Sequence, residues 1–241
     1  MSNHILDISL ASLSVAFIPT LFVFFILYKW HMNYGNAIYA NVRMISQLLI
    51  VGYLLVFIFS TNNPWLVLGI LTIMILASSW IAMGVLKKHQ VQLFKFTLVA
   101  IFVGGGINLV LITQGVLMLE PWYEPRYMIP LAGMIFANAM NSVSLAVERL
   151  DAELANKVEF KRAREIAFQA SLIPTINSLF AVGLVSLPGM MTGQILSGVS
   201  PLIAVRYQIV VMCMVFSSAG ISSALFLMLS KKYFARIIAK G

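Results

Sequence analysis

The sequence is short of charge, of cysteine and of titratable groups within its apolar runs, and each shortage excludes a class of protein. Only 10% of the 241 residues are charged and 61% are hydrophobic, whereas an ordinary soluble domain carries about 25% charged residues. The mean hydropathy is +0.94. A water-soluble fold of this size cannot cover so much apolar surface. The composition therefore excludes a soluble enzyme and a soluble nucleic-acid-binding domain, and it predicts a membrane protein.

Motifs for covalent chemistry are also missing. The single cysteine, Cys213, excludes an intramolecular disulfide and a cysteine-based zinc site, and we interpret it as a small core or lipid-facing residue. No G-x-x-x-x-G-K-[ST] motif occurs, so the chain cannot bind ATP through a P-loop. The three histidines lie outside the apolar runs and no Asp or Glu lies deep inside one, which argues against an intramembrane protease and a proton-coupled transporter. We expect no catalytic residue, no enzymatic activity and no cofactor, and the sequence leaves any metal ligands unknown.

Seven apolar runs are long enough to cross a bilayer, which takes about 20 residues of helix. We predict an all-α integral membrane protein whose residues 1–241 form a single transmembrane domain. The sixth run contains two prolines and three glycines, so it is either continuous or broken and re-entrant. The predicted spans are roughly 10–28, 44–60, 65–86, 96–118, 127–147, 171–196 and 207–230.

The basic residues gather on one side of these spans. Fourteen of the 16 fall in cytoplasmic segments if the N-terminus lies outside, and only Arg126 and Arg206 fall on the other side. Because basic loops are retained in the cytoplasm, we predict an inner-membrane protein with its N-terminus outside and its C-terminus cytoplasmic. The 14 residues are Lys29, Arg43, Lys87, Lys88, Lys95, Arg149, Lys157, Lys161, Arg162, Arg164, Lys231, Lys232, Arg236 and Lys240.

Residues 148–169 are the only sizeable predicted cytoplasmic segment. Leu150, Leu154 and Val158 recur at helical spacing, and Glu153 lies four residues before Lys157 in the favourable order for an ion pair. The pattern predicts a surface helix or an extension of the fifth span, and a solvated linker is the alternative.

Polar residues inside the spans are concentrated in the fifth and sixth. Asn138, Asn141 and Ser142 share one helical face, and an amide facing lipid is costly. This face therefore looks into the bundle or a pore, or it holds helices together by hydrogen bonds. The thioethers of the sixth span either meet a metal ion in passage or pack. The candidate substrate pathway is Asn138, Asn141, Asn177, Met190, Met191, Thr192 and Gln194.

Glycine, proline and two further cations mark candidate packing and gating positions. We interpret Gly104–Gly106 as a site where helices approach closely. Arg43 and Gln47 lie four residues apart, and Arg43 either anchors the topology or serves an inner gate. The remaining candidates are Gly133, Pro188, Gly189 and Gly193 for helix packing or a hinge, and Arg206 for a gate or topology role.

Two longer stretches carry a resemblance to a known family. They are LIPTINSLFAVGLVSLPGMMTGQILSGVSPLIAVRYQIVV (172–211) and IPLAGMIFANAMNSVSLAVERL (129–150), with Arg43, Gln47-Leu48 and Val51-Gly52 earlier in the chain. The sequence resembles the FetB/YbbM-type ABC transporter permeases over nearly its whole length. Family members carry a longer stretch between the fifth and sixth spans, which is missing here. Coupling therefore either uses the shorter helix or has been altered.

The resemblance implies a permease subunit that pairs with a separate cytoplasmic P-loop ATPase as a homodimer in the lipid bilayer. It would export iron or a related metal ion and would bind no nucleic acid. An ATPase-independent secondary transporter or channel and a non-transporting membrane scaffold are the alternatives. The predicted coupling residues are Glu148, Leu150, Leu154, Val158, Lys161, Arg162 and Arg164.

Overall fold

The described part of the chain is almost wholly helical. The structure is a computed structural model that describes residues 8–61 and 63–238, and within them the only β feature is a single bridge between Val182 and Ser186. The predicted all-α class is confirmed. The chain divides into two compact units, residues 1–61 and 62–241, and the single-domain organisation stays a prediction.

The first unit consists of three apolar helices, two of which begin at polar caps. The Ser9 hydroxyl accepts a hydrogen bond from the backbone N–H of Ser12, and the Asn33 side chain accepts one from that of Asn36. Such caps satisfy backbone donors that a helix start leaves without partners. The helices are α1 (Leu10–Val15), α2 (Ile18–Lys29) and α3 (Tyr34–Ser60).

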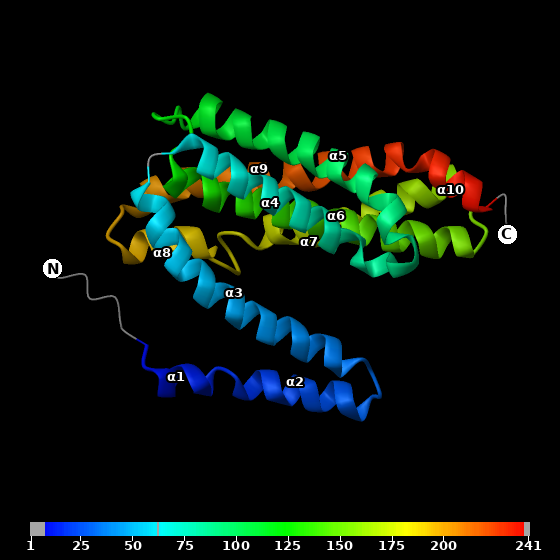
Figure 1. Ribbon diagram of the computed structural model, residues 1–241, viewed down its shortest axis with the longest axis horizontal. Helices are drawn as coiled ribbons and strands as arrows, with labels where there is room; N and C mark the ends of the chain where they lie inside the picture. Colours follow the sequence, from blue (N-terminus) through cyan, green and yellow to red (C-terminus); the bar gives the residue numbers. More distant parts are fainter. Residues whose placement is uncertain (1–7, 62, 239–241) are drawn as a thin grey trace. The chain divides into compact units, whose positions relative to one another are not determined.

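The second unit is a helical bundle, drawn from cyan to red in Figure 1. Its elements are α4 (Pro64–Ala82), the 3-10 helix η1 (Met83–His89), α5 (Gln90–Val110), the π-helix η2 (Leu111–Val116), α6 (Pro125–Ala155), α7 (Phe160–Ala181), α8 (Gly189–Leu196), α9 (Pro201–Leu229) and α10 (Lys231–Ile238). Within the unit α6 packs against α4, α5, α7 and α9. Its buried face of Leu, Ile, Val and Ala side chains supplies much of the core, so α6 is the element around which the other four are arranged.

Small residues allow α5 to approach both α9 and α6 closely. A Cβ atom added at Gly104 would lie 2.5 Å from the Ser222 Oγ and 2.9 Å from the Ser222 backbone nitrogen, and one added at Gly105 would lie 2.9 Å from the Phe136 ring. A Cβ at Gly106 would meet nothing within 4 Å in the described part of the chain. The close-approach interpretation is therefore confirmed for the first two glycines of the triplet.

Six helical stretches of the described residues, four of them made of two consecutive elements, are long and apolar enough to cross a membrane, which makes the chain a multi-pass membrane protein. Each covers or overlaps one of the predicted spans, so six of the seven predicted spans are confirmed in the described residues. The six are Ala11–Lys29, Tyr34–Ser60, Pro64–Leu86, Gln90–Val116, Pro125–Ala155 and Pro201–Arg236.

The sixth predicted span, residues 171–196, is broken. α7 ends at Ala181, residues 182–188 form a turn, and α8 begins after Pro188 at its N-cap. Gly183 adopts a φ of +85° in this turn, a conformation that costs glycine little and other residues more. Of the two possibilities that the sequence left open, the structure shows the interrupted one.

Residues 148–169 do not form a separate surface helix. α6 continues to Ala155, and the chain then turns with Lys157 at a φ of +61° before α7 begins. Extension of the fifth span is therefore correct for residues 148–155. The predicted pair of Glu153 with Lys157 is wrong, because Lys157 lies in the turn and Glu153 instead pairs with Arg149 on its own helix.

Candidate functional site

A small polar cavity lies between α6 and α7, with one side closed by α9. Its volume is about 110 Å³, which is room for a few water molecules at about 30 Å³ each. Asn138, Asn141 and Ser142 contribute from α6, as their shared helical face predicted. The other lining residues are Leu145 from α6, Ser171, Pro174, Thr175 and Ser178 from α7, and Val215 from α9.

Ser142 fixes the three helices that surround this cavity. Its hydroxyl lies 3.2 Å from the carbonyl oxygen of Ser171 on α7 and 3.3 Å from the hydroxyl of Ser223 on α9. Asn138 is held differently: its amide nitrogen donates to the backbone carbonyl of Met134, 2.8 Å away in its own helix. The interhelical hydrogen bonds at this face thus belong to Ser142, whereas the amide of Asn138 bonds along α6.

The cavity presents uncharged hydrogen-bonding groups, and none of its described lining residues is titratable. Two amides and four hydroxyls offer oxygen atoms that can replace water around a polar solute. The carbonyl of Ala170 is a further acceptor, because Pro174, four residues later in α7, has no N–H to donate to it. The site can solvate an ion or a polar molecule, and its lining residues offer no group for acid–base chemistry.

The remaining predicted pathway residues lie elsewhere. Asn177 is exposed on α7 and does not line the cavity. The Thr192 hydroxyl donates to the carbonyl of Pro188, 3.2 Å away at the start of α8. Met190 packs against the hydrophobic core, and Met191 is buried beside a separate apolar pocket. Gln194 lies on α8 outside both of these cavities.

The helix-packing role predicted for three glycines holds for none of them as a close contact in the described residues. A Cβ at Gly189 or Gly193 would meet nothing within 4 Å in the described residues, so this pair makes no close helix contact there. A Cβ at Gly133 would lie 3.5 Å from the Met74 methyl group, an ordinary van der Waals distance. Pro188 lies at the break before α8, where a hinge role stays a prediction.

The predicted ATPase-coupling residues divide into a buried set and an exposed set. Leu150 is fully buried, and Leu154 and Val158 are partly buried against the same core. Their apolar stripe therefore faces the bundle, which corrects the expectation that it is presented for docking. The exposed or half-exposed members are Glu148, Lys161, Arg162 and Arg164.

The predicted gate and topology residues are exposed in their own units. Arg43 and Gln47 lie one turn apart on α3, and Arg206 lies near the start of α9. Their roles stay predictions.

Several polar residues without a role predicted from the sequence are buried in the bundle. Ser171 and Thr175 line the polar cavity, and their spacing with Ser178 at i, i+4 and i+7 was the available signal. Asn108 is buried on α5, where its amide nitrogen donates to the Gly104 carbonyl and its oxygen accepts from the Ser217 hydroxyl on α9. This amide ties α5 to α9 beside the close glycine contact.

Comparisons with known proteins give a consistent result. The model of the uncharacterised protein family UPF0014 matches residues 10–160 and 155–234. A UPF0014 membrane protein of Synechocystis is 38% identical over 78% of this chain and 79% of its own length. The probable iron export permease protein FetB of Escherichia coli is 35% identical over 92% of this chain and 90% of its own length. The protein ALUMINUM SENSITIVE 3 of Arabidopsis thaliana is 36% identical over 78% of this chain and 73% of its own length. No solved structure matches the chain.

Proposed function

Because the chain belongs to the UPF0014 family of membrane proteins, we propose that it is the permease subunit of an ABC-type transporter. It exports iron or a related metal ion, and ATP hydrolysis on a separate cytoplasmic ATPase drives the transport. The observation that carries this proposal is the uncharged polar cavity between α6 and α7, which gathers two amides and four hydroxyls beside a hydrophobic core.

The chemistry of the cavity supports passage of a cation. Amide and hydroxyl oxygens are hard ligands of the kind that replace water around metal ions. Neutral oxygens hold a cation less tightly than carboxylates do, and conduction requires binding weak enough for the ion to leave again. Asn138 and Asn141 with the hydroxyls of α7 therefore suit transient solvation better than storage.

The absence of titratable lining residues bears on the source of energy. Proton-coupled secondary transporters relay protons through carboxylates or histidines inside the membrane. The described lining of this cavity offers none. An external source of energy fits this lining, and a partner ATPase would supply it.

Exposed polar side chains support a second copy of the chain as a further partner. Asn141 lies near the middle of α6, and Asn177 and Ser178 lie in the second half of α7; all three are exposed. Leaving amides against hydrocarbon is costly. We propose that protein covers this face, and that a homodimer provides the cover.

The ATPase would contact exposed cations at the turn between α6 and α7. Lys161 and Arg162 lie in the first turn of α7, and the guanidinium of Arg162 is 3.4 Å from the carboxylate of Glu165. Exposed ion pairs of this kind contribute little to stability, so these charges are free to serve partner recognition.

Metal accumulation in cells tests the proposed function. We expect cells that express the chain together with its proposed partner, a P-loop ATPase, to hold less iron than cells that express either one alone. Reversing two charges with Lys161→Glu and Arg162→Glu should act like omission of the ATPase. Reversal of the exposed pair Lys231 and Lys232 on α10 is the matched control and should leave export intact. Equal export without the ATPase would favour the channel or secondary-transporter alternative, and no effect on any metal would favour the scaffold.

Cysteine labelling tests the proposed orientation. In a Cys213→Ala background, Ser200→Cys before α9 should react with a membrane-impermeant maleimide on intact cells. Asn156→Cys, in the turn after α6, should react only after the membrane is opened. Both positions are exposed, so access to the thiol depends on the side of the membrane alone. Labelling of Asn156→Cys from outside would contradict a cytoplasmic C-terminus.

A further inference from the structure

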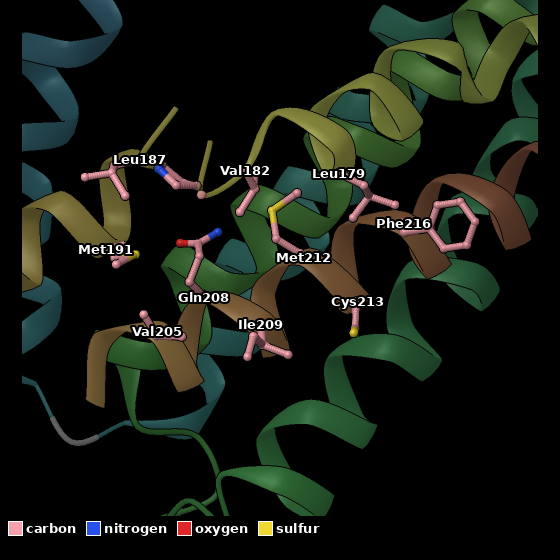
Figure 2. Close-up of a pocket in the computed structure, with 12 residues that line it drawn as sticks. Leu179, Val182, Leu187, Met191, Val205, Gln208, Ile209, Met212, Cys213 and Phe216 are labelled. Atoms are coloured by element: carbon pink, nitrogen blue, oxygen red, sulfur yellow. The ribbon is translucent and has the colours of Figure 1, made fainter. Parts of the chain in front are cut away.

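An apolar pocket lies where the broken element, formed by α7, the turn 182–188 and α8, meets α9. It is separate from the polar cavity. Its volume is about 340 Å³. The end of α7, the turn 182–188, α8 and α9 all contribute to it, as Figure 2 shows. Its walls are formed mainly by apolar side chains, among them Leu179, Val182, Leu187, Met191, Ile209 and Phe216.

One polar side chain interrupts these apolar walls. Gln208 is 5% exposed, and its Oε1 has no hydrogen-bond partner among the described residues. Figure 2 shows its carboxamide directed toward the space between Leu187, Val182 and Met212. A buried amide oxygen without a hydrogen-bond partner is costly, so a buried amide in this position calls for a partner.

The position of the pocket limits what can reach it. Gln208 lies seven residues after the first residue of α9, about 10 Å along the helix axis at 1.5 Å per residue. Leu187, Ile209 and Phe216 at its rim are also exposed on the apolar surface of the unit. A molecule would therefore enter from the hydrocarbon region and would have to be lipid-soluble.

We propose that this pocket binds a lipophilic alcohol: an apolar body that fills the volume and carries one hydroxyl, which hydrogen-bonds to Gln208. A hydroxyl fits because it can accept from Nε2 or, after rotation of the carboxamide, donate to Oε1. The occupant would contact the turn, α8 and α9 together, and so would hold the broken element against α9. This inference does not depend on the identity of the transported substrate.

The only cysteine of the chain reports on occupancy, because Cys213 lines the same pocket and is exposed. We would measure the rate of Cys213 alkylation by N-ethylmaleimide in phosphatidylcholine nanodiscs, whose lipids carry no hydroxyl. Menthol and p-menthane share one carbon skeleton and differ by the hydroxyl. We would compare the concentrations of the two probes in the membrane that halve the labelling rate of Cys213. For menthol this concentration should be about tenfold lower than for p-menthane, the effect of one hydrogen bond to a buried group.

Two variants separate the hydrogen bond from the shape of the pocket. Gln208→Met keeps an unbranched side chain but should remove the preference for menthol. Gln194→Met is the matched control, since Gln194 also has a buried Oε1 without a described partner but lies outside this pocket, and it should keep the preference. Equal protection by the two probes in the unmodified chain would overturn the proposal without any variant, as would a preference that survives in Gln208→Met.

A change of lipid identifies the natural source of the hydroxyl. Phosphatidylglycerol carries headgroup hydroxyls that phosphatidylcholine lacks. Slower labelling in phosphatidylglycerol nanodiscs that requires Gln208 would assign the occupant to the bilayer lipid itself. Unchanged labelling, together with protection by menthol, would assign the pocket to a lipophilic alcohol dissolved in the membrane.

Discussion

Replacing Asn138 and Asn141 together by leucine is expected to abolish transport while the protein still folds. The two changes remove the amide groups of α6 from the polar cavity and keep similar bulk. A solute in the cavity would then meet hydrocarbon where it had met oxygen, and an unpaired polar group in such surroundings costs several kcal/mol. Metal accumulation in cells with the ATPase present would measure the loss.

Folding should tolerate these substitutions because neither amide makes a described hydrogen bond between helices. Asn138 donates to the Met134 carbonyl within α6, and a bond of this kind contributes about 1 kcal/mol net. Size-exclusion profile and thermal unfolding in detergent would show whether the bundle is retained. Asn177→Leu is the comparison variant, because it removes an exposed amide from the face proposed for the homodimer without changing the cavity lining. Transport that survives in Asn177→Leu would assign the loss in the double variant to the cavity. Aggregation of the double variant would instead assign the amides to helix association.

The polar residues that α6 contributes to this cavity could be predicted from local sequence. Asn138, Asn141 and Ser142 fall on one face at helical spacing, and the structure places that face toward α7. The facing residues Ser171 and Thr175 carry the same signal, but they lie in a stretch where proline and glycine make the helix boundaries ambiguous. Which face of α7 turns inward depends on where α7 begins, and the turn at Lys157 sets that start.

Periodicity also shows an apolar face without showing what covers it. The spacing of Leu150, Leu154 and Val158 correctly indicates a helical stripe, yet the stripe packs within the bundle. A helix that docks a partner and one that extends a span have the same local pattern. Tertiary packing decides between them, and no single segment of sequence contains that information.

The glycine triplet provides the second large expected effect, on stability. Gly104→Ala should destabilise the bundle by about 1–3 kcal/mol, the usual cost of overpacking a well-packed core. The new Cβ would lie 2.9 Å from the Ser222 backbone nitrogen and 3.1 Å from its Cα, so α5 and α9 would have to separate. Nearby, the Asn108 amide that bonds the Gly104 carbonyl and the Ser217 hydroxyl would be displaced as well. Thermal unfolding in detergent should begin roughly 5 °C lower.

Gly106→Ala is the matched control for this change, since a Cβ there meets nothing within 4 Å in the described part of the chain. It should stabilise by about 0.4–1 kcal/mol, because alanine restricts the unfolded chain and suits a helix. Adding Ser222→Gly to Gly104→Ala removes the hydroxyl 2.5 Å from the new Cβ but leaves the backbone contact. Only partial recovery is therefore expected. Full recovery would show that the hydroxyl alone limits the approach, and equal unfolding temperatures for Gly104→Ala and Gly106→Ala would refute a close contact between α5 and α9.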